Sequence, residues 1–309
     1  MQRVLTTVTL LGLLVATAAA FAITEHLKLI RSPVFGTLVT KVFSPVCNCS
    51  TNRAVVRIKL RHADKVTVTI VDAGHHRVAT VATGVHMEAR HPRSFPWHGR
   101  TSSGAVAPDG VYYPWVHLEH ANHTFEFTNR ITLDTTTPKV LSATGAKPVL
   151  FAGPGRTVAL RYEFSEPANA LVYLGNRLVI RGRPTREHDK VKWAGTLDGR
   201  PLPAGTYALS VAARDAAGNE TRATGRQKVT VVLRYAVITP SRVDARAGRP
   251  FTVHVQTAAP RYTWRLAHKH GSRRRRLLRV HAPTTPGTYR LVVTANGNPT
   301  VAIVRVRAK

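Results

Sequence analysis

Acidic residues are scarce in this sequence, with 16 Asp and Glu against 45 Lys and Arg and a formal net charge of +29 at pH 7. The basic excess is spread along the chain rather than gathered in one tail. A surface of this charge attracts polyanions, namely nucleic acid, anionic lipid or an anionic wall polymer. The compartment of the protein must therefore decide among these partners.

Helix signals are nearly absent after the first thirty residues, whereas Val, Thr, Tyr and turns built from Gly and Pro are frequent. This pattern predicts an all-β protein. A length of 309 residues with 43% hydrophobic residues is enough for two or three domains with buried cores.

The chain also lacks the motifs of common enzymes. It has no nucleophile elbow, no zinc-protease helix motif and no phosphate-binding loop. Paired carboxylates for glycosidase chemistry are rare, and those present fall in or beside predicted strands, where a solvent-facing role is sufficient. These carboxylates are Glu119, Glu126, Glu163 and Glu166. The sequence therefore predicts no catalytic residue and no cofactor.

Histidine is abundant, with nine of its 15 residues between positions 62 and 123. His117, His120 and His123 surround one predicted hairpin, and Asn122 marks a turn among them. A metal site needs three or four side chains that converge, with further groups that orient them. The spacing of these histidines does not provide this, so no metal ligand is predicted.

Near the N-terminus, Arg3 is followed by twenty uncharged residues, Val4–Ile23. Twenty such residues cross a bilayer as a helix, and a basic residue on the short side places the rest of the chain outside. The alternative is a cleavable signal peptide, because small residues at Ala18–Ala20 and Ala20–Ala22 offer cleavage sites. The apolar run is longer than a usual signal core, which favours the uncleaved anchor.

Under either interpretation the body of the chain is exported. Residues 1–24 are then the anchor or signal, and residues 25–41 a juxtamembrane stalk. Export disfavours nucleic acid as a partner. It leaves anionic envelope polymer, lipid head groups or another envelope protein. Because the exported compartment is oxidising, we expect Cys47 and Cys49 to form a local disulfide, the alternative being a bond to another chain.

An internal repeat organises the remainder of the chain. Trp97-x-Gly99 is followed by Pro108-x-Gly110-x-Tyr112, and the same order recurs from Trp193 to Tyr207. Trp fills the core of a small β-domain, Gly after Pro takes the left-handed position of a turn, and the Tyr hydroxyl bonds back to that turn. The residues predicted to form this structural core are Trp97, Gly99, Gly110, Tyr112, Trp193, Gly195, Gly205, Tyr207 and, in a weaker third copy, Tyr289.

The repeat and the spacing of the predicted strands indicate three tandem Ig-like β-sandwich domains. Their boundaries are 42–135, 136–234 and 235–309. In the second, Val158–Phe164 and Ala170–Leu174 are expected as two strands, and the closing hairpin returns along Glu220–Val232.

Phe43-Ser44-Pro45, the alternating strands and the Trp-to-Tyr unit resemble the Ig-like domain of flagellar hook-capping proteins. The resemblance covers residues 43–133, extends to the Trp-to-Tyr half of residues 138–232, and implies tandem Ig-like domains in an exported envelope protein of a high-GC Gram-positive lineage. The module also occurs in many exported proteins that have no tie to flagella. The acidic loop usual after Phe-Ser-Pro is replaced here by the two cysteines, so a cation of that loop is not carried over.

The third predicted domain holds fifteen Lys and Arg but only one acid, Asp244. Its densest run is predicted to lie at a hairpin tip and consists of Arg273, Arg274, Arg275 and Arg276, with Arg279 close by. One interpretation is a solvated loop; the other is a contact with anionic head groups or wall polymer, since Arg grips phosphate with two N–H groups. Tyr262 and Trp264 are expected in the core.

Three functions are compatible with these features. The first is a non-enzymatic membrane-anchored envelope protein that acts as a structural, adhesion or binding scaffold. The second is a wall-polymer or carbohydrate-binding module, which exposed aromatic residues on one sandwich face would favour. The third, a flagellar accessory, depends on analogy of fold alone.

Overall fold

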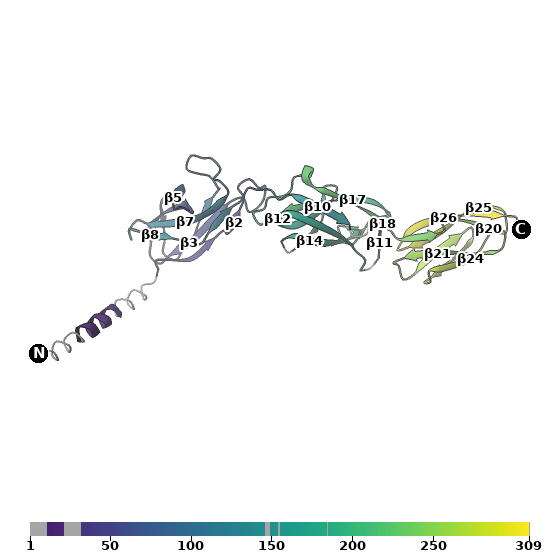
Figure 1. The fold of residues 1–309 in the computed structure, drawn as a ribbon, viewed down its shortest axis with the longest axis horizontal. Coiled ribbons are helices and arrows are strands. Elements are labelled where there is room, and N and C mark those ends of the chain that lie inside the picture. Colours follow the sequence, from purple (N-terminus) through teal and green to yellow (C-terminus); the bar gives the residue numbers. More distant parts are fainter. Residues whose placement is uncertain (1–10, 22–31, 146–148, 154, 184, 309) are drawn as a thin grey trace. The chain divides into compact units, whose positions relative to one another are not determined.

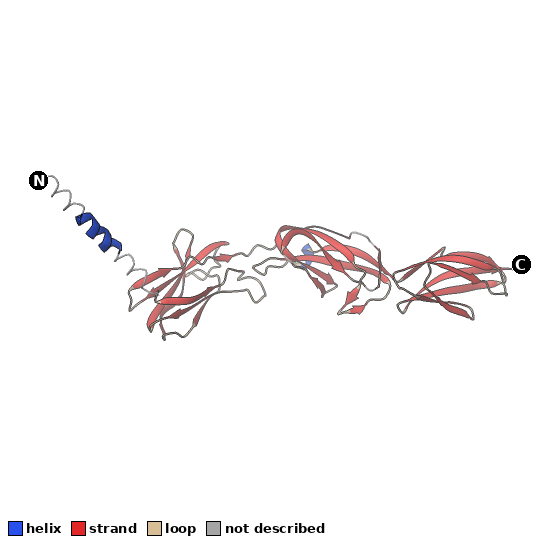
Figure 2. Ribbon diagram, turned by 90° about the horizontal axis from the view of Figure 1, so that it is seen from below, coloured by secondary structure: helices blue, strands red, loops and turns tan. Residues whose placement is uncertain are grey.

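A computed structural model describes residues 11–21, 32–145, 149–153, 155–183 and 185–308 of the chain. These residues divide into two compact units, Met1–Thr135 and Thr136–Lys309, called here the first and second unit. Apart from a helix over residues 11–21 and one short helical turn, η1 (Ala223–Gly225), the described residues are strands and loops (Figures 1 and 2). The protein is all-β, as its sequence predicts.

The described helix covers only part of the uncharged run Val4–Ile23, because residues 1–10 and 22–31 lie outside the described residues. Among the described residues, no helix has both the length and the apolar content needed to cross a membrane. The anchor therefore stays a prediction from sequence.

The first unit is a sandwich of two sheets. Strands β1 (Val34–Val39), β3 (Ala54–Leu60) and β6 (Arg93–Trp97) form one sheet in that order. The other has the order β2-β9-β7-β4-β5, with β8 also paired to β7; these strands are β2 (Val42–Phe43), β9 (Ile131–Leu133), β7 (Gly110–Leu118), β4 (Asp64–Asp72), β5 (Arg77–Met87) and β8 (His123–Glu126).

The core of the first unit lies between these sheets because alternate side chains of each strand point inward. Val56 and Ile58 of β3 and Val66 and Val68 of β4 are fully buried in one cluster. Strand β1 corrects the predicted stalk over residues 25–41: it pairs with β3 and buries Val34 in the same core. Its short apolar alternation was too weak a signal to identify a strand before its partner was known.

The N-terminal part of the second unit contains a sheet of order β10-β12-β17-β18-β11, with β13 and β14 also paired to β12. The strands are β10 (Val140–Gly145), β11 (Val149–Phe151), β12 (Val158–Leu174), β13 (Arg177–Arg181), β14 (Arg186–Trp193), β17 (Gly205–Arg214) and β18 (Gln227–Arg234). The small hairpin β15 (Thr196–Leu197) and β16 (Arg200–Pro201) lies within the glycine loop of the repeat.

Two predictions for this region are wrong in detail. The two strands expected over 158–174 are one continuous strand, whose pairing with β14 is irregular between Glu163 and Ala168. Pro167 has no N–H to donate to a ladder, so the strand changes partners there without ending. The return strand is also shorter than predicted, because 3₁₀ turn η1 precedes it and β18 begins only at Gln227.

The C-terminal part of the second unit has one sheet of order β19-β21-β24 and one of order β20-β26-β25-β22-β23. The strands are β19 (Ala236–Thr239), β20 (Arg242–Arg246), β21 (Pro250–Thr257), β22 (Tyr262–Leu266), β23 (Lys269–Arg273), β24 (Leu277–His281), β25 (Gly287–Ala295) and β26 (Asn298–Arg307). Residues from both sheets, such as Val253, Leu278, Leu291 and Val304, are fully buried.

Candidate functional site

The tryptophans of the repeat have the same local structure in the two units. Trp97 ends β6 and Trp193 ends β14, and each is 2% exposed. The indole N–H of each donates a hydrogen bond to the carbonyl oxygen three residues ahead, at 2.9 Å to Arg100 and 3.0 Å to Thr196. Each Trp therefore fills the core with its ring and fastens the loop that follows.

The tyrosines of the repeat fasten the turn that precedes them. In all three copies the hydroxyl donates to the carbonyl oxygen four residues before it: Tyr112 to Pro108 at 2.6 Å, Tyr207 to Pro203 at 2.8 Å and Tyr289 to Thr285 at 2.9 Å. The rings of Trp97 and Tyr112 also meet, with centroids 4.9 Å apart. This arrangement is a tyrosine corner.

The glycines of the repeat have two different roles. Gly99 and Gly195 adopt left-handed conformations, with φ of 67° and 75°. A Cβ at either position would come within 2.8 Å of Pro45 or 2.7 Å of Leu233 respectively. Gly110 and Gly205, by contrast, were predicted to be left-handed, and this prediction is wrong. They begin β7 and β17 and pair as extended residues in the ladder.

Cys47 and Cys49 are joined by a disulfide in the loop between β2 and β3, with Cα atoms 5.3 Å apart. The hydroxyl of Thr51 lies 3.0 Å from Sγ of Cys49. The bond therefore closes a small local ring and does not link distant parts of the chain.

The arginine run does not lie at a hairpin tip, which corrects the prediction from sequence. The tip of the β22–β23 hairpin is Ala267-His268, and Arg273 is the last residue of β23. Arg274, Arg275 and Arg276 connect β23 to β24 of the other sheet. No local pattern signals this crossing, because a change of sheet depends on pairings with strands distant in the chain.

Arg273–Arg276 and Arg279, called here the basic segment, all have exposed side chains. Their backbone is nevertheless fixed. The carbonyl oxygen of Arg275 accepts a hydrogen bond from the Tyr262 hydroxyl at 2.9 Å, and that of Arg276 accepts one from the Val255 N–H at 2.7 Å. Burial raises the pKa of Tyr262, and the charge of Arg273 opposes this shift. The segment thus presents guanidinium groups from an ordered crossing.

The two aromatic residues near the basic segment differ in burial. Tyr262 is 2% exposed and belongs to the core, whereas Trp264 is half-buried and packs against that core. A Cβ at Gly271, the strand partner of Trp264, would come within 3.0 Å of the indole nitrogen. Gly271 therefore covers part of the Trp264 ring.

A buried carboxylate orders the turn between β7 and β8. Asp64, 8% exposed, accepts backbone hydrogen bonds from Lys65 at 2.6 Å, His120 at 2.9 Å and Ala121 at 3.2 Å. Burial alone raises the pKa of this carboxyl, but the three backbone donors, together with the charge interaction with His120, more than offset it and hold the pKa below its usual value of 3.8. Asp64 therefore stabilises this turn in its ionised form.

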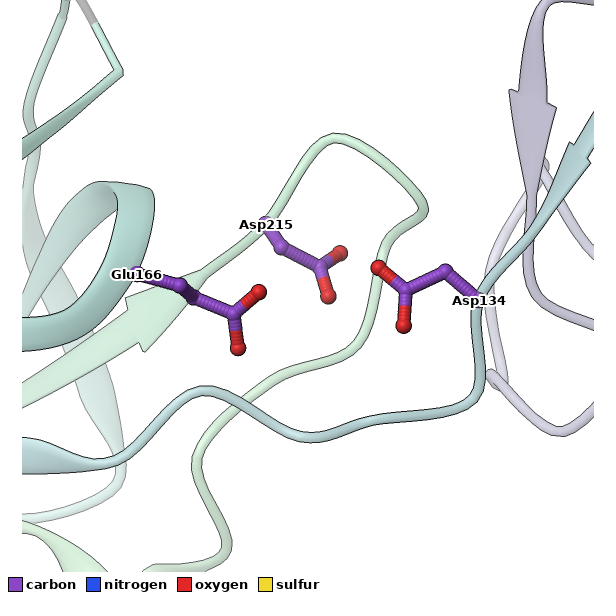
Figure 3. Close-up of side chains that lie close together, drawn as sticks. All are labelled: Asp134, Glu166 and Asp215. Atoms are coloured by element: carbon purple, nitrogen blue, oxygen red, sulfur yellow. The ribbon is translucent and has the colours of Figure 1, made fainter. Parts of the chain in front are cut away.

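The histidines around that turn are not brought together as metal ligands. Among the described residues, the side-chain groups that lie close enough together to hold a metal ion include no histidine. Nδ1 of His117 instead lies 3.0 Å from the Thr124 hydroxyl. Glu166 and Asp215, both in the second unit, have carboxylate oxygens within 4.8 Å of each other (Figure 3).

Asp215 has a structural explanation. One of its oxygens accepts the N–H groups of Gly218 and Asn219, and the other accepts the side-chain amide of Asn219 at 2.8 Å. These bonds form the Asp215-x-x-Gly-Asn turn after β17. Asp134, which Figure 3 also labels, belongs to the first unit, where its N–H donates to the carbonyl of Phe43. No metal is assigned to these acids.

Sequence reasoning missed two groups of side chains. Arg181, Arg183 and Arg214 line one open hollow of about 670 Å³ in the second unit, and the distance of Arg214 from the other two in sequence concealed the group. Tyr113 and Trp115 lie half-buried on the outer face of β7. The sequence contained a signal for them. A strand with one buried face needs large apolar residues at alternate positions only, whereas Gly110–Leu118 carries them at both sets of alternate positions.

The two-layer architecture and the Trp-to-Tyr units define an Ig-like β-sandwich protein. Residues 49–120 match the family described as the FlgD Ig-like domain. This match confirms the resemblance to the Ig-like module of hook-capping proteins for that part of the chain. No curated protein matches the sequence.

Solved structures of tandem Ig-like and fibronectin-like domains are similar to this chain at low identity. The titin fragment I67–I69 has 10% identity and a TM-score of 0.30, with 90% of this chain and 99% of that chain covered. The Clostridium thermocellum CbhA fibronectin(III)-like modules have 11% identity and a TM-score of 0.35, with 65% and 93% covered. Drosophila OTK extracellular domains 3–5 have 11% identity and a TM-score of 0.22, with 90% and 98% covered. Scores this low carry no argument about domain arrangement or function.

Proposed function

We propose that the protein is a non-catalytic extracytoplasmic scaffold of three Ig-like sandwiches, tethered at its N-terminus and in contact with anionic envelope polymer or lipid head groups. The Ig-like fold supports the scaffold, since such sandwiches serve as structural and binding modules. The observation that carries the anionic partner is the basic segment, whose side chains are exposed while its backbone is fixed.

The division of the second unit into two sandwiches is supported by a repeated topology. In each of three regions an early strand runs parallel to the last strand: β2 with β9, β11 with β18 and β20 with β26. Each region also has its own tyrosine corner. This repetition supports one Ig-like sandwich in each of the three regions.

The extracytoplasmic location is supported by the uncharged run Val4–Ile23 and by the Cys47–Cys49 disulfide, since disulfides persist in oxidising compartments. The protein is then a single-pass membrane protein, or is secreted if the run is cleaved. Membrane fractionation with sequencing of the mature N-terminus tests the tether. Recovery of a soluble chain beginning near Ile23 would contradict it.

The basic segment has enough charge to matter for binding. A basic residue near an anionic membrane contributes about 1 kcal/mol, an effect that fades within a Debye length. Arg also forms two parallel N–H···O bonds with one phosphate. Mutual repulsion and solvation make the summed binding free energy of five arginines an upper bound. Nucleic acid is not proposed as a partner, because the proposed location is extracytoplasmic.

The test is cosedimentation of the full-length chain with anionic vesicles, neutral vesicles and an anionic wall polymer over a salt series. One variant replaces Arg273–Arg276 with Ser. The matched control replaces four other exposed arginines of the same region, Arg242, Arg246, Arg290 and Arg305, and so changes the charge equally. We expect anionic binding that weakens with salt and is lost preferentially in the first variant. Equal loss of binding in both variants would mean that binding depends on net charge and not on the basic segment. No loss of binding in either variant would refute the anionic contact.

A further inference from the structure

A second hollow lies on the outer face of the first unit. It has a volume of about 350 Å³ and is lined mainly by aromatic and polar side chains of β7, of the turn after β4, of the end of β8 and of the segment after β8. This volume is near the lower end of the range of small-molecule sites. The residues that line it are Ala73, His75, Tyr113, Trp115, Glu126, Phe127 and Thr128.

The aromatic wall of this hollow is not part of the core. Along β7, Tyr112, Val116 and Leu118 are buried, whereas the alternate residues Tyr113 and Trp115 are half-buried on the opposite face. The hydrophobic cluster of the first unit includes the former residues and excludes the latter two. Each ring keeps part of its surface accessible on this outer face, where a ligand can reach it.

His75 is held against this wall by its turn. The backbone N–H of His75 donates to the carbonyl of Asp72, and the carboxylate of Asp72 accepts the N–H groups of Gly74 and His76. His75 itself is left-handed, with φ of 65°, a conformation uncommon outside glycine. Its ring meets Trp115 edge to face, with centroids 5.6 Å apart and planes at 87°. The platform is thus fixed before any ligand arrives.

Polar groups stand at the edge of the platform without partners. Among the described residues, the Tyr113 hydroxyl, the Glu126 carboxylate and the Thr128 hydroxyl have no hydrogen bond or ion pair within the protein, although all three line the hollow. The segment that carries the last two is ordered, because the Phe127 N–H donates to the carbonyl of Pro114 at 3.1 Å. Donors and acceptors therefore surround apolar ring faces in one hollow.

We propose that this hollow binds one sugar ring of a glycan. A pyranose ring matches the apolar and polar groups of this hollow. Its C–H face packs on an aromatic ring, and its hydroxyls, which both donate and accept hydrogen bonds, contact the polar groups at the edge. The small volume and the free hydroxyl and carboxylate groups favour a sugar over a peptide segment. The site is independent of the basic segment, since it lies in the first unit and contains no arginine.

The experiment is isothermal titration of the full-length chain with a panel of neutral oligosaccharides, including N-acetylglucosamine and glucose tetramers, with a proline-rich peptide as the other ligand class. Trp115→Ala removes the platform, and Tyr113→Phe removes one hydroxyl only. The matched control is Phe35→Ala, a half-buried aromatic residue on β1 of the opposite sheet. Thermal unfolding of each variant verifies that the first unit is folded.

We expect at least one saccharide to bind. Trp115→Ala should weaken binding about tenfold or more, as for a central aromatic anchor, and Tyr113→Phe should weaken it less. Phe35→Ala should bind as the parent does. Three outcomes overturn the proposal: no saccharide of the panel binds at millimolar concentration, binding survives in a folded Trp115→Ala variant, or only the proline-rich peptide binds in a Trp115-dependent manner.

Discussion

The glycine that follows each repeat tryptophan allows conformational and steric effects to be separated. Gly99 has φ of 67°, and a Cβ added to it would lie 2.8 Å from Cγ and 2.9 Å from Cβ of Pro45. Gly104, in the same loop, has φ of 85° and nothing within 4 Å of an added Cβ. Gly104→Ala therefore tests the left-handed backbone alone, and Gly99→Ala tests the backbone together with the contact.

The expected costs follow from these two geometries. A left-handed L-residue costs about 1–2 kcal/mol, and the stiffer unfolded chain of Ala offsets about 0.4–1 kcal/mol of this. Gly104→Ala should therefore destabilise the first unit by about 1 kcal/mol. Gly99→Ala adds overpacking against a rigid proline ring, which costs about 1–3 kcal/mol. It should destabilise the unit by about 2–4 kcal/mol in total.

Calorimetric unfolding measures this difference. Since 1 kcal/mol shifts the Tm of a domain of this size by about 4–8 °C, Gly99→Ala should unfold at least about 4 °C below Gly104→Ala. The repeat provides an internal replicate: Gly195 has a Cβ position 2.7 Å from Leu233, whereas Gly199 has nothing within 4 Å. That pair should shift the transition of the second unit instead. Equal shifts for Gly99→Ala and Gly104→Ala would refute the steric part of the reasoning.

Three further outcomes are expected. Trp97→Ala and Trp193→Ala should each destabilise their unit by about 3–5 kcal/mol, as measured by urea unfolding, and a loss below about 1 kcal/mol would mean that the repeat does not form the core. Mass spectrometry of the exported chain without reduction should show Cys47 and Cys49 blocked to alkylation, so two labelled thiols would contradict the disulfide. The pKa of Asp64 is lower in the folded than in the unfolded chain, so its stabilisation is present above the usual value of 3.8 and is lost as pH falls below it. The stability of the first unit should therefore decrease as the pH falls below about 4, and Asp64→Asn should remove part of that dependence; an identical pH profile in the variant would show that Asp64 makes no contribution.

Local sequence determined the repeat unit of this protein. Trp97 bonds three residues ahead and Tyr112 four residues back, so the partners of each lie within the motif that predicted them. Because such contacts depend on short-range geometry, the same residues produce the same structure from Trp193 to Tyr207. The β class follows equally from local patterns of Val, Thr and turn residues.

Tertiary structure decided the features that depend on strand pairing. The strand over Val158–Leu174 continues through a predicted break because it meets different partners on either side. Arg274–Arg276 form a connection between sheets instead of the predicted hairpin tip, because β23 and β24 belong to different sheets. In each case the deciding hydrogen bonds join residues far apart in the chain, which no local pattern contains.

The aromatic hollow shows the same division within one strand. The sequence of β7 places Tyr113 and Trp115 in the register opposite to the core, which is a local property. Only the pairing of β7 with β4 and β8 brings His75 from one neighbour and Glu126 from the other to the same face. A binding site needs several side chains close together in space, and the order of residues in the sequence does not show which distant side chains meet. The alternation along β7 therefore predicts two rings on its outer face but does not predict the site.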